Sequence, residues 1–484
     1  MIRLFAYIIV FACLPAGCRK PVTPDLIRDR QPAIFPDYSD VVFPPNMAPP
    51  NFRIDEQGDD FLAEIGVNGQ ILLTYRSSAP EVCIRESAWR RFAGEHAGAE
   101  YFVRISVKQG GRWVQWKDIV NRIARQPIDP YLVYRLLYPG YELWNEMGIY
   151  RRDLTSFGES AVVENKSLEK GCVNCHTFCR HSPDTMLLHI RGKMGGTVIR
   201  RHGATVKKDI KIPGGRHHGA YASWHPSGKF IAYSAGDIKQ FFHLTGKKPV
   251  EVFDLESDLI IYDVDADRIF ADSAISGEKY LETYPDWSPD GKNLYFCRTG
   301  AILKTASPDS IRYDLYRVSF DPAARTFGTP ECIYNASGHG KTVALPRVSP
   351  DGRYLMCSMF DYGNFGIWHP ESELSLLNLT TGEMRVMDEV NSPDVESFHA
   401  WSSSGRWFVF SSKRMDGLWA RPYFAYFDPE TGDASKPFPL PQKDPNFYEY
   451  FTKTYNLPEL IKAPITDKRR FYRTEIIPIR KADR

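Results

Sequence analysis

A turn-and-strand unit that occurs four times is the feature that most constrains how this chain folds. The units begin at Trp224, Trp287, Val348 and Trp401, at spacings of 63, 61 and 53 residues. Each runs from a large apolar residue through a tight turn into an apolar strand, as in Trp287-Ser-Pro-Asp-Gly-Lys-Asn-Leu-Tyr-Phe-Cys297. Proline presets φ, aspartate bonds back to the backbone, and glycine supplies a positive φ. Because one such unit cannot bury both of its faces, the repeat predicts an all-β fold of stacked blades, a β-propeller.

A second motif, Cys172-Val-Asn-Cys175-His176, matches the attachment pattern of c-type haem. In that reading Cys172 and Cys175 form thioethers with the haem, and His176 is the proximal iron ligand. Haem c is therefore a predicted cofactor, with His189 as the candidate for the second axial position. Two alternatives stay open, a disulfide and a zinc site that adds Cys179. The other nearby candidate ligands are Met186, Met194, His202, His217 and His218.

The first residues predict export. Met1-Ile2-Arg3 is followed by an almost wholly apolar run from Leu4 to Ala16, and Ala16-Gly17 precedes Cys18. This arrangement predicts a secretory signal over residues 1–17 and resembles a bacterial lipoprotein signal. The resemblance implies lipidation of Cys18 and a membrane anchor in the cell envelope, facing the periplasm. The alternative is an ordinary cleaved signal with an incidental cysteine.

The repeated Trp-Ser-Pro-Asp-Gly-Lys strands are similar to the blade motif of TolB-like propellers, also called WD40-like Asp-rich repeats. Together with the lipoprotein-like start and the Cys-x-x-Cys-His motif, the chain looks like a group of bacterial TolB-like lipoproteins. That resemblance implies six blades within residues 184–484, which include a C-terminal tail. Four blades contain the motif, residues 184–223 suit a fifth, and the sixth needs the tail or a strand from upstream. A propeller hosts many functions, so the resemblance indicates fold more than activity.

Three segments are predicted ahead of the propeller. Residues 18–52 contain eight prolines and no periodic apolar pattern, which is typical of an extended linker. Residues 53–125 show alternating strand patterns and the hairpin signal Gly110-Gly111, which predict a small β-sandwich-like accessory domain. Residues 126–183 lack clean alternation, and we interpret them as a connector that holds the Cys-x-x-Cys-His motif.

Charge and motifs restrict the function. The 61 Lys and Arg residues against 59 Asp and Glu residues leave a net charge of +2, which gives no support to nucleic-acid binding. The sequence contains no Gly-x-Ser-x-Gly, P-loop or His-Glu-x-x-His motif, so we expect no enzyme activity of its own. The leading hypothesis is electron transfer or redox sensing with a docked protein partner. The alternative is a haem-free interaction scaffold in the cell envelope, with Cys172 and Cys175 as a disulfide or metal site.

Overall fold

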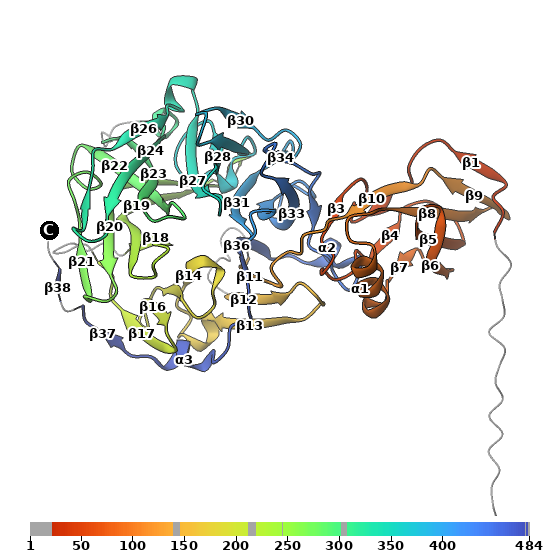
Figure 1. Ribbon diagram of the computed structural model, residues 1–484, viewed down its shortest axis with the longest axis horizontal. Helices are drawn as coiled ribbons and strands as arrows, with labels where there is room; N and C mark the ends of the chain where they lie inside the picture. Colours follow the sequence, from red (N-terminus) through yellow and green to blue (C-terminus); the bar gives the residue numbers. More distant parts are fainter. Residues whose placement is uncertain are drawn as a thin grey trace, which may run out of the picture.

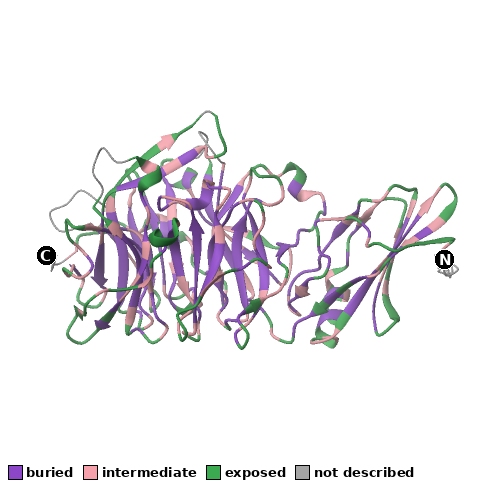
Figure 2. Cartoon of the chain, turned by 90° about the horizontal axis from the view of Figure 1, so that it is seen from above, coloured by how far each residue is buried: buried purple, intermediate pink, exposed green. Residues whose placement is uncertain are grey.

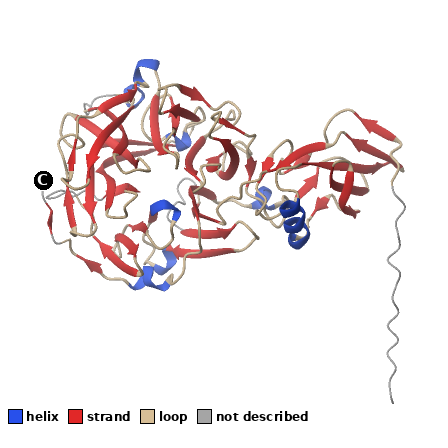
Figure 3. Ribbon diagram, viewed as in Figure 1, coloured by secondary structure: helices blue, strands red, loops and turns tan. Residues whose placement is uncertain are grey.

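The computed structural model describes residues 22–138, 146–211, 219–243, 245–301, 307–479 and 481–482. The predicted signal, the lipidation site Cys18 and the pair His217 and His218 lie outside these residues. Strands joined by loops dominate the described part, with a few short helices (Figure 3). No helix in it has the length and apolar character needed to cross a bilayer.

A ring of sheets confirms the β-propeller prediction (Figure 1). Within the described residues, six sheets of four or five strands surround a common axis, and most of their strand residues are buried (Figure 2). The innermost strands are β14 (Val173–Phe178), β18 (Gly219–Trp224), β22 (Tyr280–Trp287), β27 (Thr342–Val348), β31 (Glu396–Trp401) and β36 (Thr454–Ile461).

The remaining strands of the ring continue outward from these six. In chain order they are β11 (Tyr131–Leu137), β12 (Met147–Asp153), β13 (Glu159–Glu164), β15 (Met186–Ile190), β16 (Gly196–Arg201), β17 (Ala204–Lys208), β19 (Phe230–Phe242), β20 (Val250–Asp263), β21 (Arg268–Phe270), β23 (Asn293–Gly300), β24 (Asp314–Asp321), β25 (Thr326–Phe327), β26 (Glu331–Tyr334), β28 (Tyr354–Phe360), β29 (Glu373–Asn378), β30 (Met384–Val386), β32 (Trp407–Ser412), β33 (Arg421–Asp428), β34 (Asp433–Ala434) and β35 (Phe438–Pro439). Parallel pairs add β37 (Ile476–Ile477) to β17 and β38 (Lys481–Ala482) to β21.

The repeated turn has the chemistry that the sequence predicts. Gly291 has φ +75°, which a residue with a side chain rarely adopts. The Asp290 carboxylate accepts the Lys292 amide at 3.0 Å, and the Ser288 hydroxyl accepts the Asn293 amide at 2.9 Å. These local bonds fix the turn that joins the innermost strand β22 to the apolar strand β23 beside it.

The connector interpretation of residues 126–183 is wrong. Strands β11, β12 and β13 form one sheet of the ring, and β36 from near the C-terminus pairs with β11 to complete it. The propeller therefore starts near Tyr131 and not at residue 184. The segment lacks alternation because β11 is buried on both faces, with apolar side chains pointing each way.

The prolines of residues 22–52 do not form a free linker either. This stretch supplies β1 (Leu26–Arg28), β2 (Ile34–Phe35), β3 (Val42–Phe43) and the start of β4 (Phe52–Ile54), which pair with strands of the accessory domain. Strands of two or three residues are too short to show a period in the sequence. The rest of that domain comprises β5 (Asp60–Val67), β6 (Gln70–Ser77), β7 (Glu81–Val82), α1 (Glu86–Glu95), β8 (Glu100–Gln109), β9 (Arg112–Trp116) and β10 (Ile119–Ile123).

The accessory domain packs directly on the ring through one shared apolar core. Phe43 lies 4.7 Å from Phe438 between ring centroids, and Trp407 of β32 donates to the Gln126 carbonyl at 3.0 Å. On the same side, α2 (Phe447–Tyr450) lies between β35 and β36 in the chain. The helix α3 (Arg469–Arg473) lies in the C-terminal tail, where its Phe471 packs in a different apolar cluster with Val173 and Met186. The two parts of the chain therefore bury apolar surface against each other.

Candidate functional site

The Cys-x-x-Cys-His motif lies at the start of β14, an innermost strand, and follows the register of the other five. In β14, Thr177 pairs with Leu187 and Phe178 with Met186, as Ala400 pairs with Val409 and Trp401 with Phe408 in β31. The motif is therefore one copy of a position series that runs around the axis. His176 corresponds to Ala222, Pro285, Pro346, His399 and Pro458.

His176 is a buried residue between two sheets. The residue is 2% exposed, and its ring lies beside the Val133 and Leu457 backbones without a hydrogen bond of good geometry to a described residue. Burial, together with the nearby Arg135 guanidinium, lowers the pKa of His176 to about 3. The imidazole is therefore neutral at physiological pH and packs beside Phe178, with ring centroids 5.9 Å apart.

The two motif thiols face a different space from the imidazole. Cys172 and Cys175 line a cavity on the axis that holds about 910 Å³ of empty space, part of it open to solvent. His176 is not among the described residues that line it. These residues do not fit a haem held by both thiols with His176 on its iron, because the imidazole lies in the packing between sheets and not on the cavity wall.

The zinc and disulfide alternatives gain no support from the described residues. All three motif-region cysteines are unpaired thiols, and no group of three or more His, Cys, Asp or Glu side chains there could hold a metal. Cys179 lies apart, with its sulfur 3.6 Å from the His225 carbonyl oxygen. Burial raises the pKa of Cys172 and of Cys179, which keeps these thiols protonated and weakly nucleophilic.

The proposed distal ligand His189 lies in β15, outside this cavity. It lines a neighbouring pocket, and its Nδ1 is 3.0 Å from the Thr197 hydroxyl. Met186 is fully buried in an apolar cluster, and His202 occupies a turn with φ +50°. The structure thus brings the two thiols to one wall but does not bring His176 or His189 to it.

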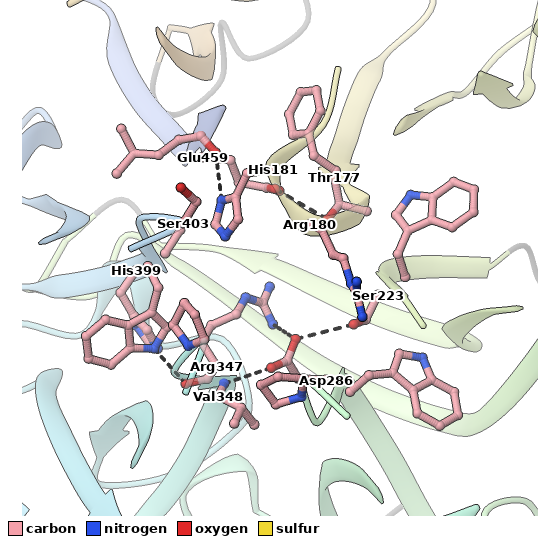
Figure 4. A pocket seen from close by; sticks show the side chains of 18 of the residues that line it. Thr177, Arg180, His181, Ser223, Asp286, Arg347, Val348, His399, Ser403 and Glu459 are labelled. Atoms are coloured by element: carbon pink, nitrogen blue, oxygen red, sulfur yellow. Dashed lines mark hydrogen bonds and ion pairs between the residues drawn. The ribbon is translucent and has the colours of Figure 1, made fainter. Parts of the chain in front are cut away.

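A second cavity, here called the polar funnel, shares Phe398 and Leu457 with the first, and Figure 4 shows side chains that line it. It holds about 1480 Å³ of empty space, part of it open to solvent. Its inner wall is one position series of the innermost strands, the residue just before the large apolar residue of each motif. The members are Thr177, Ser223, Asp286, Arg347, Ala400 and Glu459.

The carboxyl groups in the funnel differ in how many hydrogen bonds and ion pairs other residues provide for them. The Asp286 carboxylate accepts the Val348 amide at 2.8 Å and the Ser223 hydroxyl at 3.3 Å, and it lies 3.7 Å from the Arg347 guanidinium. Burial still raises the pKa of Asp286. Asp286 is thus held by three groups of the fold.

Glu459 has weaker support. Among the described residues its carboxyl contacts the Thr177 hydroxyl at 3.4 Å and the Phe178 backbone, neither of which carries a charge, and burial raises the pKa of this carboxyl to about 8. No Lys or Arg of the described residues forms an ion pair with it. A carboxyl in this state is protonated at neutral pH and would ionise when a cation docks beside it.

Asp286, Arg347 and Glu459 are not among the site residues predicted from the sequence. Each of them directly precedes the large apolar residue of its unit. In a propeller this position of the innermost strand faces the axis, so the repeat itself could have indicated them. Glu459 also required knowing that β36 belongs to the ring.

No known protein-family profile matches the chain, and no curated protein matches its sequence. Solved structures match parts of the chain. Hydrazine synthase of Kuenenia stuttgartiensis is 12% identical, with a TM-score of 0.45 over 73% of this chain and 48% of that one. An oligogalacturonate lyase in complex with manganese is 14% identical, with a TM-score of 0.31 over 59% and 84%. Prolyl oligopeptidase B of Galerina marginata is 11% identical, with a TM-score of 0.34 over 74% and 50%. The chain thus spans about half the length of the hydrazine synthase chain that it matches, and these likenesses concern the fold alone.

Proposed function

We propose that this chain is an interaction scaffold of the cell envelope whose polar funnel receives a charged segment of a partner protein. The observation that carries the proposal is the incompletely satisfied Glu459 carboxyl on the funnel wall. A docked lysine or N-terminal amine would supply the missing counter-charge, and Glu459 would release its proton.

Two polar side chains of the funnel are held by other parts of the fold. The Ser403 hydroxyl donates to the Asp129 carboxylate at 2.7 Å. The His181 Nδ1 lies 3.0 Å from the Leu460 carbonyl oxygen. Both side chains are thus engaged in fixing the rim of the funnel.

Site-specific photo-crosslinking tests the proposal in intact cells. A photoreactive residue at Ser403, on the funnel, is compared with one at Glu430, whose side chain is 68% exposed on the outside of the ring. We expect one discrete crosslinked product from position 403, lost when Glu459→Lys is added, and none from position 430. Equal products from both positions, or a product at 403 that survives Glu459→Lys, would contradict a funnel-directed partner.

The anchor is part of the same proposal and rests on the sequence around Cys18. Cys18→Ala should release the protein from the membrane fraction, whereas a chain that stays there has another means of attachment. Haem attachment at Cys172 and Cys175 stays a prediction, and no step of the proposed function passes through it.

A further inference from the structure

We propose that the cavity lined by Cys172 and Cys175 is a binding site for a flat organic anion, such as an aromatic or conjugated carboxylate. Its site and its test are separate from those of the funnel. Phe398 and Leu457 line both this cavity and the funnel, so these two side chains lie between the two cavities.

The wall of this cavity has the composition that such a ligand needs. Its aromatic side chains include Tyr221, Phe365, Trp368 and Phe398, which offer flat apolar faces. The charged side chains among the described lining residues are two arginines, Arg135 and Arg191, and no Asp or Glu is among those residues. Arg191 also lines the neighbouring pocket, together with Asp209, Asp237 and Asp254. An aromatic surface with cationic groups of one sign selects a flat ligand that bears negative charge.

Arg135 has no partner of opposite charge among the described residues. Its Nη1 donates to the Asn174 amide oxygen at 2.6 Å, and with the Asn456 amide turned over, its Nη2 donates to that oxygen at 3.2 Å. Neither partner carries a charge, and the buried Nε has no hydrogen-bond partner among the described residues. A guanidinium in this state gains a charge-assisted hydrogen bond when a carboxylate or sulfonate enters.

A long hairpin roofs the cavity. Strand β18 pairs with β19 only as far as Ala235, but β19 and β20 continue to pair up to Phe242 and Val250. The extension starts at Gly236, where a Cβ would lie 1.9 Å from the Glu256 carbonyl oxygen, so only glycine fits there. Beyond that point Ile238, Gln240, Val250 and Val252 line the cavity.

Two contacts fasten the roof to the sheet that contains β28 and β29. Tyr362 donates to Glu251 at 2.7 Å, and the Lys248 ammonium lies 2.5 Å from the Glu371 carboxylate. Lys248 also lies 4.2 Å from the Tyr362 ring centroid. These contacts hold the hairpin over its side of the cavity, and we expect a ligand to enter faster when they open.

Titration with anilinonaphthalene sulfonate, a fluorescent flat anion, tests the site in the purified chain. We expect saturable binding at one site, weakened about tenfold or more by Arg135→Gln through the lost charge-assisted bond. Arg191→Gln, at the exposed rim, gives a second variant should Arg135→Gln disturb folding. The matched control is Arg353→Gln, whose side chain is 42% exposed and pairs with Glu430 outside the ring. Glu459→Lys should leave the affinity unchanged, which separates this site from the funnel.

Two further readouts place the probe. Bound probe should slow alkylation of Cys172 and Cys175, measured by peptide mass spectrometry, but not that of the exposed Cys332. Lys248→Met should speed probe association, and Lys247→Met, at an exposed neighbour, should not. Binding that does not saturate, that ignores both arginine variants, or that leaves the two thiols unprotected would overturn the proposal.

Discussion

Strands β14 and β31 are two innermost strands of one ring, and each carries a histidine at the same position. His176 and His399 are 2% and 3% exposed, and burial lowers the pKa of each to about 3, aided by Arg135 and Arg347 respectively. The Nε2 of His399 lies 3.0 Å from the Met356 carbonyl oxygen. Val133 occupies the position that corresponds to Met356, and its backbone lies beside His176. The β31 strand has no cysteine at the matching positions.

The comparison separates the two halves of the Cys-x-x-Cys-His motif. The histidine has a structural explanation that does not involve the cysteines, because β31 uses the same residue in the same place without them. The cysteines have no such counterpart. At the Cys175 position the other innermost strands carry Tyr221, Tyr284, Leu345, Phe398 and Leu457, all with positive φ, whereas Cys175 is not among the described residues with a positive φ.

The largest expected effect is on stability in acid. Between pH 6.5 and about 3 the unfolded chain takes up a proton at each imidazole that the folded chain keeps neutral. The free energy of unfolding therefore falls as the pH falls, by up to about 1.4 kcal/mol per pH unit for each histidine. Urea unfolding across this range should show a shallower pH dependence in the double variant His176→Ala and His399→Ala. If His399→Ala reduced the pH dependence of the free energy of unfolding and His176→Ala did not, the two histidines would not be equivalent.

Cys175 and Phe398, one residue before the two histidines, should differ strongly in their contributions to the free energy of unfolding. Phe398→Ala removes a buried aromatic ring and should lower the free energy of unfolding by about 3 kcal/mol or more. Cys175→Ala removes one sulfur from a cavity wall and should change it by less than about 1 kcal/mol. Equal losses in urea unfolding would mean that Cys175 is a packing residue like Phe398.

At neutral pH the two histidines should again behave alike. His176→Ala and His399→Ala each leave space between sheets and should each lower the free energy of unfolding by about 1–3 kcal/mol. Alanine already occupies this position in β18, as Ala222, so both variants should fold. Thermal melting of the two single variants side by side is the measurement, and a loss confined to one of them would contradict a shared role.

The smallest effect concerns Glu459, whose counterpart in β31 is Ala400. Its folded pKa of about 8 exceeds its ordinary value of 4.5, so its contribution to stability is present below pH 4.5 and is lost as the pH rises toward 8. Water in the funnel screens the charge, so the slope stays below about 1.4 kcal/mol per pH unit. Glu459→Gln should flatten the decline between these pH values in urea unfolding, and Ala400→Gln serves as the control. An unchanged slope would mean that Glu459 is already ionised.

Local chemistry made much of the ring predictable. The turns around Asp290 and Gly291 follow from residue types alone, and so does each apolar strand that leaves them. The sheet containing β11 could not be found this way, because its strand is buried on both faces and its partner β36 lies more than 300 residues away in the sequence.

The candidate site shows a different limit. The spacing of Cys172, Cys175 and His176 suggested one ligand set, but a strand sends neighbouring side chains to opposite sides. A signal was present, since Phe178 stands where Trp224, Trp287 and Trp401 open the other units. Extending the repeat by one unit, to the strand that ends at Phe178, would have aligned His176 with His399.

The most direct test is an intact-mass and visible-absorption comparison of the wild type, His176→Ala and His399→Ala, all made in a host that matures c-type cytochromes. Our account predicts that both variants match the wild type in mass, apart from the substitution, and in absorption, because neither imidazole serves as an iron ligand. If His176→Ala alone lost a haem mass or a Soret band that the wild type and His399→Ala possess, the claim that these two histidines are equivalent would be contradicted.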